Sequence, residues 1–196
     1  MAKAALFVID GFEETEAITT VDILRRGEVE VTTVSLTGKE MVNGKHGITI
    51  HADTTFEKAC GEEFDMLVIP GGTVDYTKHD GLLNMVKRYD GEKKYLAAIC
   101  AAPAVFGKAG ILHGKKAVCY PGMESWLDGA VIGENIVETD GHITTSKGPA
   151  TTMFFALKLV EILKGKDVAQ KVGDAFLVPL ISHDHSFYEQ PCIPVE

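Results

Sequence analysis

One cysteine stands where a reactive thiol is expected. The apolar run 95–99 stops at Cys100, and Ala101, Ala102 and Pro103 follow it. This pattern predicts a buried strand that turns sharply into a helix, with the thiol at the corner. The N-terminal end of a helix favours the thiolate, which is the nucleophilic and redox-active form of cysteine. A small buried cysteine that only packs in the core fits the same segment equally well.

A glycine pair is the second feature that suits a reactive site. Gly71 and Gly72 follow the apolar run 65–70. Because glycine has no side chain, the backbone at such a pair can approach a ligand closely. Two amides that converge on one oxygen could stabilise a tetrahedral oxyanion. An ordinary tight turn has the same pattern.

Strand and helix signals alternate along the chain. We predict strands at 4–10, 29–36, 65–70, 94–99, 116–120 and 143–146. Helices are predicted at 13–26, 55–60, 82–89, 102–109 and 150–163, and a last helix runs from its cap at Asp167 to about Phe176. A small hairpin is predicted within 37–50. This order indicates βαβ units, with a largely parallel sheet and helices on both faces. Ligands of such sheets bind at the carboxyl ends of the strands, so the loops 11–16 and 71–74 and the Cys100 elbow compete for that place.

The composition is that of an acidic globular protein. The chain has 196 residues and a formal net charge of -9, which disfavours nucleic acid or an anionic membrane as a partner. No apolar stretch is long enough to span a bilayer, and no signal-peptide pattern precedes the first strand, so a cytoplasmic location is expected. Cysteines at 60, 100, 119 and 192 form no CxxC pair, which favours reduced thiols.

Five segments, in this order, resemble the ThiJ/PfpI superfamily. They are GFEETE at 11–16, VDILRR at 21–26, VIPGG at 68–72, AAICAAP at 97–103 and TSKGPAT at 145–151. The nearest branch is that of the parkinsonism-associated deglycase. The resemblance covers roughly residues 3–180. It implies a flavodoxin-like three-layer α/β sandwich, a homodimer, one domain over residues 1–181 and a C-terminal extension over 182–196.

The resemblance also implies a set of site residues. Cys100 would be the elbow cysteine, Glu16 its carboxyl partner, and the backbone amides of Gly72 and Ala101 an oxyanion-binding pair. Further substrate-binding positions are expected at Gly71, Tyr120 and Pro149.

Glu16 also has physical properties that suit a partner of this thiol. Helical spacing places Glu16 on one face with Thr20 and Ile23, so its side chain need not point into water. A charged carboxylate beside a thiolate would raise the pKa of the thiol, whereas a protonated carboxyl would donate a hydrogen bond and lower it. We therefore expect a coupled pair in which Glu16 holds the proton. Glu13 and Glu14 are interpreted as first-turn acids that the helix dipole favours.

The sequence departs from two family patterns that involve histidine. Peptidase-like members carry histidine directly after the elbow cysteine, where this chain has Ala101. The parkinsonism branch often has a histidine-proline pair on the following strand, where this chain has Tyr120 and Pro121. Tyr120 could supply a hydroxyl to a substrate or simply pack. His46, in the hairpin region, could reach the site of a neighbouring subunit.

The remaining cysteines and the C-terminal tail are weaker candidates for a reactive or metal-binding site. Cys60, at the end of a short helix, and Cys119, in a predicted strand, are interpreted as structural. His183, His185 and Cys192 could bind a metal, but their spacing matches no standard site, which favours a solvated or dimer-draped tail. We predict no resident metal and no cofactor.

These features lead to three hypotheses of function. The first is a cytoplasmic stress-response protein that acts on reactive dicarbonyls or their early adducts, with Cys100 as nucleophile and Glu16 as acid and base. The second is a non-enzymatic redox sensor or redox-regulated chaperone, in which an oxidant converts Cys100 to the sulfinate. The third and weakest is a cysteine peptidase or amidase. The expected partners are a small aldehyde or an oxidant and a second copy of the chain.

Overall fold

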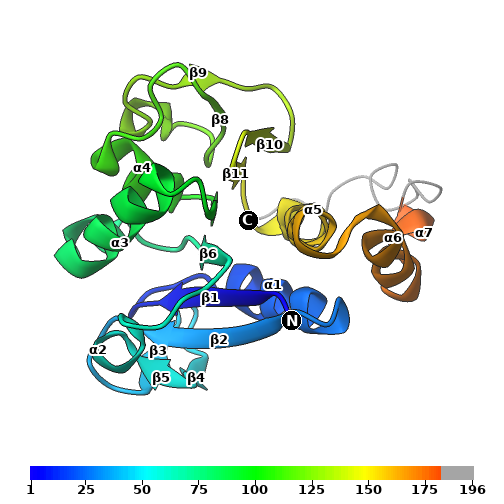
Figure 1. Cartoon of the computed structure of the whole chain (residues 1–196), viewed down its shortest axis with the longest axis horizontal. Coiled ribbons are helices and arrows are strands. Elements are labelled where there is room, and N and C mark those ends of the chain that lie inside the picture. Colours follow the sequence, from blue (N-terminus) through cyan, green and yellow to red (C-terminus); the bar gives the residue numbers. More distant parts are fainter. Residues whose placement is uncertain (182–196) are drawn as a thin grey trace, which may run out of the picture.

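A seven-stranded sheet runs through the centre of the protein, which we describe from a computed structural model over residues 1–181. The strand order is β10-β11-β7-β6-β1-β2-β5, and the pairs are parallel except that β10 runs antiparallel to β11 (Figure 1). The strands are β1 (Lys3–Val8), β2 (Glu30–Ser35), β5 (Thr54–Thr55), β6 (Met66–Ile69), β7 (Tyr95–Ile99), β10 (Val137–Asp140) and β11 (Ile143–Ser146).

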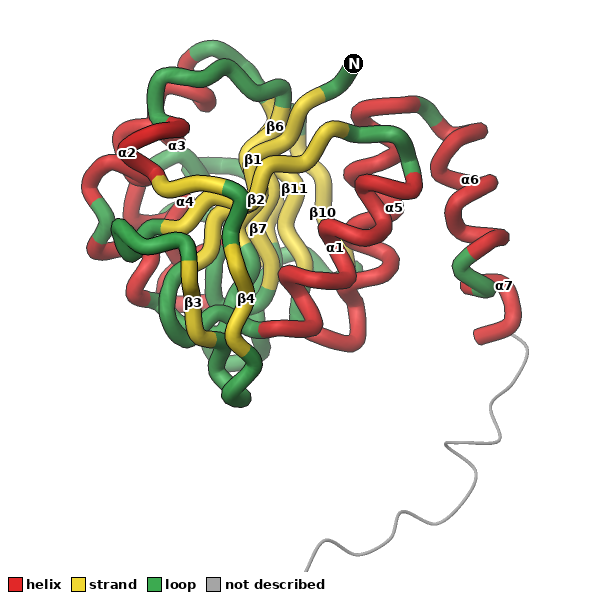
Figure 2. The backbone as a smooth tube through the Cα atoms, turned by 90° about the horizontal axis from the view of Figure 1, so that it is seen from below, coloured by secondary structure: helices red, strands yellow, loops and turns green. Residues whose placement is uncertain are grey.

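Helices cover both faces of this sheet, as the alternating pattern predicts (Figure 2). One layer holds α1 (Glu14–Arg26) and α5 (Thr152–Lys164); α6 (Lys166–Ala175) packs on α5 outside this layer, and α7 (Val178–Ile181) packs on α6. The other layer holds α2 (Phe56–Ala59), α3 (Asp80–Gly91) and α4 (Pro103–Ala109). Short 3-10 helices lie at η1 (Asp75–Lys78), η2 (Glu124–Trp126) and η3 (Pro149–Thr151).

Two small sheets lie outside the central one. The predicted hairpin forms from β3 (Met41–Asn43) and β4 (Thr49–His51), which pair antiparallel. A second pair joins β8 (Lys116–Ala117) to β9 (Val131–Ile132) in parallel.

The core follows from the continuous apolar runs of the central strands. All four residues of β6 are buried, as are four of the five residues of β7, because helices cover both faces. Helix α1 buries Ala17, Ile23 and Leu24 against this layer. Ile69 of β6 pairs with Ala98 of β7, so the chain leaves both strands at the same edge of the sheet. That edge carries the glycine pair and the cysteine.

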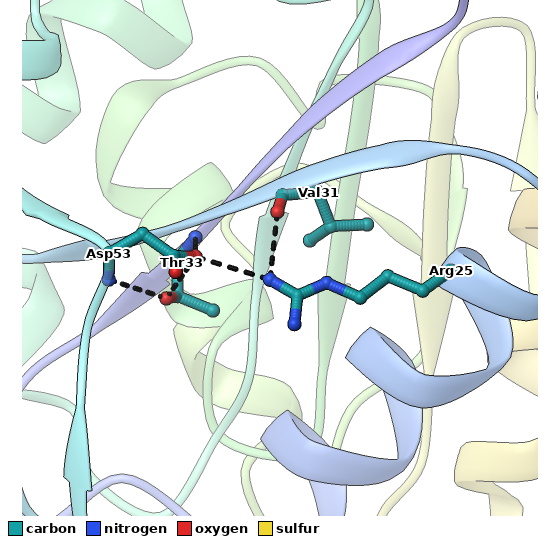
Figure 3. Close-up of polar contacts among 4 residues, drawn as sticks. All are labelled: Arg25, Val31, Thr33 and Asp53. Atoms are coloured by element: carbon teal, nitrogen blue, oxygen red, sulfur yellow. Dashed lines mark hydrogen bonds and ion pairs between the residues drawn. The ribbon is translucent and has the colours of Figure 1, made fainter.

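A partly exposed network of polar contacts ties helix α1 to the sheet (Figure 3). Arg25, in its last turn, donates hydrogen bonds to the carbonyl of Val31 at 3.0 Å and to Asp53 at 3.2 Å. The same Asp53 oxygen accepts from the backbone N–H of Thr33 at 2.8 Å and from its hydroxyl at 2.7 Å. One end of α1 is thereby tied to β2, which constrains where its other end, with Glu16, can lie.

The structure differs from the predicted elements in several places, including the following three. The strand expected at 116–120 ends at Ala117, so Cys119 and Tyr120 lie in a loop rather than a strand. Helix α6 begins at Lys166 after Gly165, so Asp167 lies in the first turn and is not the cap. The antiparallel strand β10 was not predicted, because its polar sequence, VETD, shows no apolar run.

Two further expectations concern membrane-spanning helices and the C-terminal extension. Within residues 1–181, no helix is long and apolar enough to cross a membrane. The predicted extension 182–196, with His183, His185 and Cys192, lies outside the described residues, so its boundary and its role stay predictions.

Candidate active site

The chain makes the predicted elbow at Cys100, between β7 and α4. Its φ of 64° lies in the left-handed region, which costs a non-glycine residue about 1–3 kcal/mol. Two backbone hydrogen bonds hold this conformation: Cys100 N–H donates to the carbonyl of Ser146 at 3.0 Å, and its own carbonyl accepts from Tyr120 N–H at 2.9 Å. Strain held in place by neighbouring segments is typical of functional corners. The side chain is 8% exposed.

Glu16 lies against this thiol from helix α1. Its side chain is fully buried, and Oε2 accepts a hydrogen bond from the backbone N–H of Gly71 at 2.7 Å. The Cys100 thiol lies beside this carboxyl, close enough that each group shifts the pKa of the other, and Glu16 Oε1 is buried without a hydrogen-bond partner among residues 1–181. Glu13 caps the helix, because its carboxylate accepts from Glu16 N–H at 2.7 Å. The two predicted reactive groups therefore meet, although they are far apart in the sequence.

Burial dominates the electrostatics of this pair. It raises the pKa of Glu16 to about 7, against the opposing effects of the Gly71 amide and the Cys100 thiol. Burial, and then the charge of Glu16, raise the pKa of Cys100 to about 12, against the opposing amides of Ala101 and Gly72. The first shift agrees with a proton on Glu16. The second contradicts the expected low thiol pKa, because burial and a neighbouring charge outweigh the helix N-terminus. The site accommodates one negative charge, shared between the two groups.

The backbone amides of Gly72 and Ala101 both hydrogen-bond toward the Cys100 sulfur. Both act to lower the pKa of the thiol, and their role as an oxyanion-binding pair stays a prediction. Gly72 has a φ of 95°, and a Cβ there would collide with backbone atoms of Gly11, Phe12 and Glu13. Only glycine fits this position. The amide of Gly71, by contrast, is already used by Glu16, so Gly71 supports the acid rather than a substrate.

A cleft of about 310 Å³ opens onto the thiol. Tyr120 lines it, as predicted, and is 49% exposed. Pro149 does not line it; this residue is exposed at the start of η3, next to Gly148, which packs near the Tyr120 ring. The lining residues are Lys45, Gly72, Thr73, Val74, Cys100, Ala101, Tyr120 and Met123. Thr73 and Val74 belong to the loop 71–74 that was expected at this edge of the sheet, whereas Lys45 and Met123 were not among the predicted site residues.

Glu14 lies in the first turn of α1, as expected, and it also holds the hairpin turn. It is 4% exposed and accepts hydrogen bonds from His46 N–H at 2.6 Å and from the His46 ring Nδ1 at 2.9 Å. Burial works to raise the pKa of Glu14, but these hydrogen bonds outweigh it and lower the pKa. His46 is thus held by Glu14 of its own chain. Whether it reaches a second subunit stays a prediction.

The hairpin turn carries Lys45 to the cleft. Lys45 N–H donates to the carbonyl of Phe12 at 2.8 Å, and Gly11 N–H donates to the carbonyl of Asn43 at 2.7 Å. The turn between β3 and β4 is therefore fixed to the loop that precedes helix α1. No spacing in the sequence pairs residue 45 with residue 12, so this contact had no signal there.

Other candidate groups contribute less to a reactive site. Cys60 is exposed, and Cys119 is buried, with its pKa raised to about 11 by burial and by Glu124. Ligand atoms of Glu13, Glu14 and His46 lie within 4.8 Å of one another, but hydrogen bonds within the chain already engage each of these side chains.

Comparison with known proteins decides the family. The DJ-1/PfpI family model matches residues 2–162. The chain belongs to this family. It is 35% identical to protein dj-1beta of Drosophila melanogaster over 184 residues, which are 91% of this chain and 98% of that protein. It is 30% identical to deglycase PH1704 of Pyrococcus horikoshii, over 83% of this chain and 99% of that protein.

A longer relative and two solved structures complete the comparison. Identity to DJ-1 homolog B of Arabidopsis thaliana is 43% over 87% of this chain, but the match spans only 40% of that protein. The chain thus covers about two fifths of the length of this plant relative. Drosophila melanogaster DJ-1beta superposes with a TM-score of 0.85 at 34% identity, covering 90% of this chain and 97% of that one. Oxidised Toxoplasma gondii DJ-1 superposes with a TM-score of 0.87 at 35% identity, and the match covers 90% of this chain and 98% of that one. The flavodoxin-like α/β fold is confirmed.

Proposed function

We propose that the protein is a cysteine-dependent stress-response enzyme that acts on reactive dicarbonyls or their early adducts. The observation that carries this proposal is the buried contact between Cys100 and Glu16, with the amides of Gly72 and Ala101 beside the sulfur. Among residues 1–181, no histidine lines the cleft. The site therefore offers one nucleophile and one group that can both give and take a proton. One relative of this chain, PH1704, is named a deglycase.

The chemistry fits an aldehyde such as methylglyoxal. The Glu16 carboxylate takes the proton of the Cys100 thiol as the sulfur attacks the aldehyde carbon, a C–S bond forms, and Glu16 gives the proton to the carbonyl oxygen, which yields a hemithioacetal. Glu16, again a carboxylate, then removes the proton from that carbon and returns it to the neighbouring carbonyl carbon, while the hydroxyl proton passes to the neighbouring oxygen, so that a thioester forms. Water hydrolyses the resulting thioester to lactate and restores the thiol. The net reaction adds one water and needs no external oxidant, because one carbon is oxidised while its neighbour is reduced.

The pKa of Glu16 suits this role. A value of about 7 keeps both protonation states populated near neutral pH, as a group that acts in turn as acid and base requires. The two amides would stabilise the alkoxide before it takes its proton.

The test is the formation of lactate from methylglyoxal by the purified protein. We expect turnover by the unmodified protein and by Cys60→Ser, which changes an exposed thiol outside the cleft. Cys100→Ser should form no lactate above the uncatalysed rate. Equal turnover in Cys100→Ser would refute the proposal, and the absence of lactate from the unmodified protein would do so as well.

A redox sensor or redox-regulated chaperone is the second candidate. It is favoured by the surroundings of the sulfur, because a carboxyl and two amides could hold the oxygens of a sulfinate. Two equivalents of peroxide would supply those oxygens. Peroxide titration with peptide mass spectrometry tests this, since the sensor requires oxidation of Cys100 before Cys60. Peptidase or amidase chemistry has less support, because no described histidine reaches the cleft to act as base.

Two expectations about the whole protein remain proposals. A homodimer is supported by a groove beside helix α1, where Ile18, Val21 and Ile50 present apolar surface. A cytoplasmic location is proposed from the sequence. Light scattering of the purified chain and fractionation of the cells that produce it test these two statements.

A further inference from the structure

The cleft above Cys100 carries one charged side chain besides its reactive groups. Lys45 lines the cleft, and the other lining residues apart from Cys100 are uncharged. Among the residues that the structure describes, Lys45 forms no ion pair within 4.0 Å. Some other exposed lysines do pair, such as Lys58 with Glu40 and Lys78 with Asp75, whereas Lys87, like Lys45, has no ion pair within residues 1–181 but lies outside the cleft. An unpaired cation is thus placed at the opening of a reactive site in a chain of net charge -9.

Hydrogen bonds of the hairpin turn fix the position of Lys45. Its backbone N–H is bonded to Phe12, and its neighbour His46 is bonded twice to the buried Glu14. The turn that carries Lys45 is therefore anchored at two successive residues. Its charge also reaches the reactive pair, since it acts to lower the pKa of Glu16, against burial, which raises it.

We propose that Lys45 makes this cleft selective for small carbonyl compounds that carry a carboxylate. The ammonium of Lys45 would pair with the carboxylate while the thiol reaches the carbonyl carbon. Lysine suits this task because its charge is compact and its long side chain can follow a small ligand. This inference rests on the proposed function for its biological meaning, but the binding preference itself can be measured without turnover.

The probe is a pair of alkylating reagents of nearly the same shape. Iodoacetate carries a carboxylate, and iodoacetamide is its neutral counterpart. Both react when a thiolate attacks the methylene carbon, so that a C–S bond forms and iodide leaves. The ratio of the two rates at Cys100 cancels any change in the nucleophilicity of the thiol. This matters because removing Lys45 also alters the field at Glu16.

We expect Lys45→Gln to lower the ratio of iodoacetate to iodoacetamide rates at Cys100 by about fivefold at low salt, which corresponds to a screened ion pair. Lys45→Arg should have the same rate ratio as the unmodified protein. Added salt should reduce the difference in this ratio between the unmodified protein and Lys45→Gln. Lys87→Gln is the matched control, because it removes the same charge from an exposed position on α3 that does not line the cleft. The exposed Cys60, read in the same samples, gives an internal reference.

A second measurement uses carbonyl compounds in place of alkylating probes. Glyoxylate, an aldehyde with a carboxylate, and methylglyoxal, a neutral dicarbonyl, are each tested for protection of Cys100 from iodoacetamide. Lys45→Gln should weaken protection by glyoxylate about fivefold and leave protection by methylglyoxal unchanged.

Two results would overturn the inference. One is an unchanged alkylation ratio in Lys45→Gln; the other is an equal fall in Lys87→Gln. If methylglyoxal neither protects Cys100 nor yields lactate while the alkylation ratio still depends on Lys45, then the proposed function fails and the anion preference stands.

Discussion

Glu14 accepts two hydrogen bonds from His46, one from the backbone N–H at 2.6 Å and one from the ring Nδ1 at 2.9 Å. Glu14 lies in the first turn of the helix that carries Glu16, and His46 follows Lys45 in the hairpin turn. This one buried carboxylate therefore connects the proton-transferring group to the cation at the cleft. It positions both without contacting the thiol.

The first prediction follows from this connection. Glu14→Ala leaves the N–H of His46 without its acceptor, which should lower the free energy of unfolding by about 1–3 kcal/mol. It should also lower the iodoacetate preference of Cys100 toward the value for Lys45→Gln, although Lys45 is still present. Urea unfolding and the alkylation ratio are the measurements, with Glu62→Ala, at an exposed acid, as control. An unaltered ratio in folded Glu14→Ala would show that the turn holds its position without Glu14.

The second prediction separates two roles of Glu16. Glutamine keeps a hydrogen-bond donor near the sulfur but cannot transfer a proton, whereas alanine removes both functions. If the protein is an enzyme, Glu16→Gln and Glu16→Ala should both lose lactate formation. If Cys100 is chiefly a sensor, Glu16→Gln should still form the sulfinate with peroxide, and Glu16→Ala should form it less readily. Wild-type turnover in both variants would remove Glu16 from the mechanism.

The third prediction concerns the pH dependence of stability. The pKa of Glu16 rises from 4.5 to about 7 on folding, so the folded state keeps a proton that the unfolded state has lost. Its stabilising contribution is complete below about pH 4.5 and is lost as the pH rises to about 7. The shift corresponds to about 3 kcal/mol. Urea unfolding of the wild type and of Glu16→Gln should therefore differ more at pH 8 than at pH 4.5, with the variant relatively more stable at the higher pH. Parallel pH profiles would contradict the raised pKa.

The fourth prediction tests the geometry of the amide pair. Gly72→Ala adds a methyl group against the backbone of the loop 11–13, at a φ of 95°. We expect a loss of more than about 2 kcal/mol in the free energy of unfolding and a loss of Cys100 reactivity. Gly38→Ala is the control, because Gly38 also has a positive φ, of 75°, but open space around its Cα. It should cost only about 1 kcal/mol. Equal losses in the two variants would show that close packing at Gly72 is unimportant.

Much of this fold could be predicted from local patterns. The apolar runs at 65–70 and 94–99 are the strands β6 and β7, and the thiol stands at the elbow after the second, with its backbone in the left-handed region. Small residues and a proline after Cys100 carried that prediction, because they suit a tight corner and the start of a helix. The strand β10 was missed, since an edge strand of polar residues gains its stability from pairing with β11 and not from its own hydrophobic pattern.

The candidate site, like the fold, was predictable only in part from the sequence. By itself, the sequence determined which residue types stand at the strand ends: a cysteine at a corner, two glycines after a strand and an acid early in a helix. Only the tertiary structure decided how they act on one another. Burial of Cys100 beside Glu16 raises both pKa values, where local reasoning expected the helix N-terminus to lower that of the thiol. The same holds for Lys45, which lines the cleft from a turn that Glu14 and Phe12 hold by hydrogen bonds. Desolvation and long-range contacts depend on what surrounds a group in space, and the neighbours of a residue along the chain do not specify that.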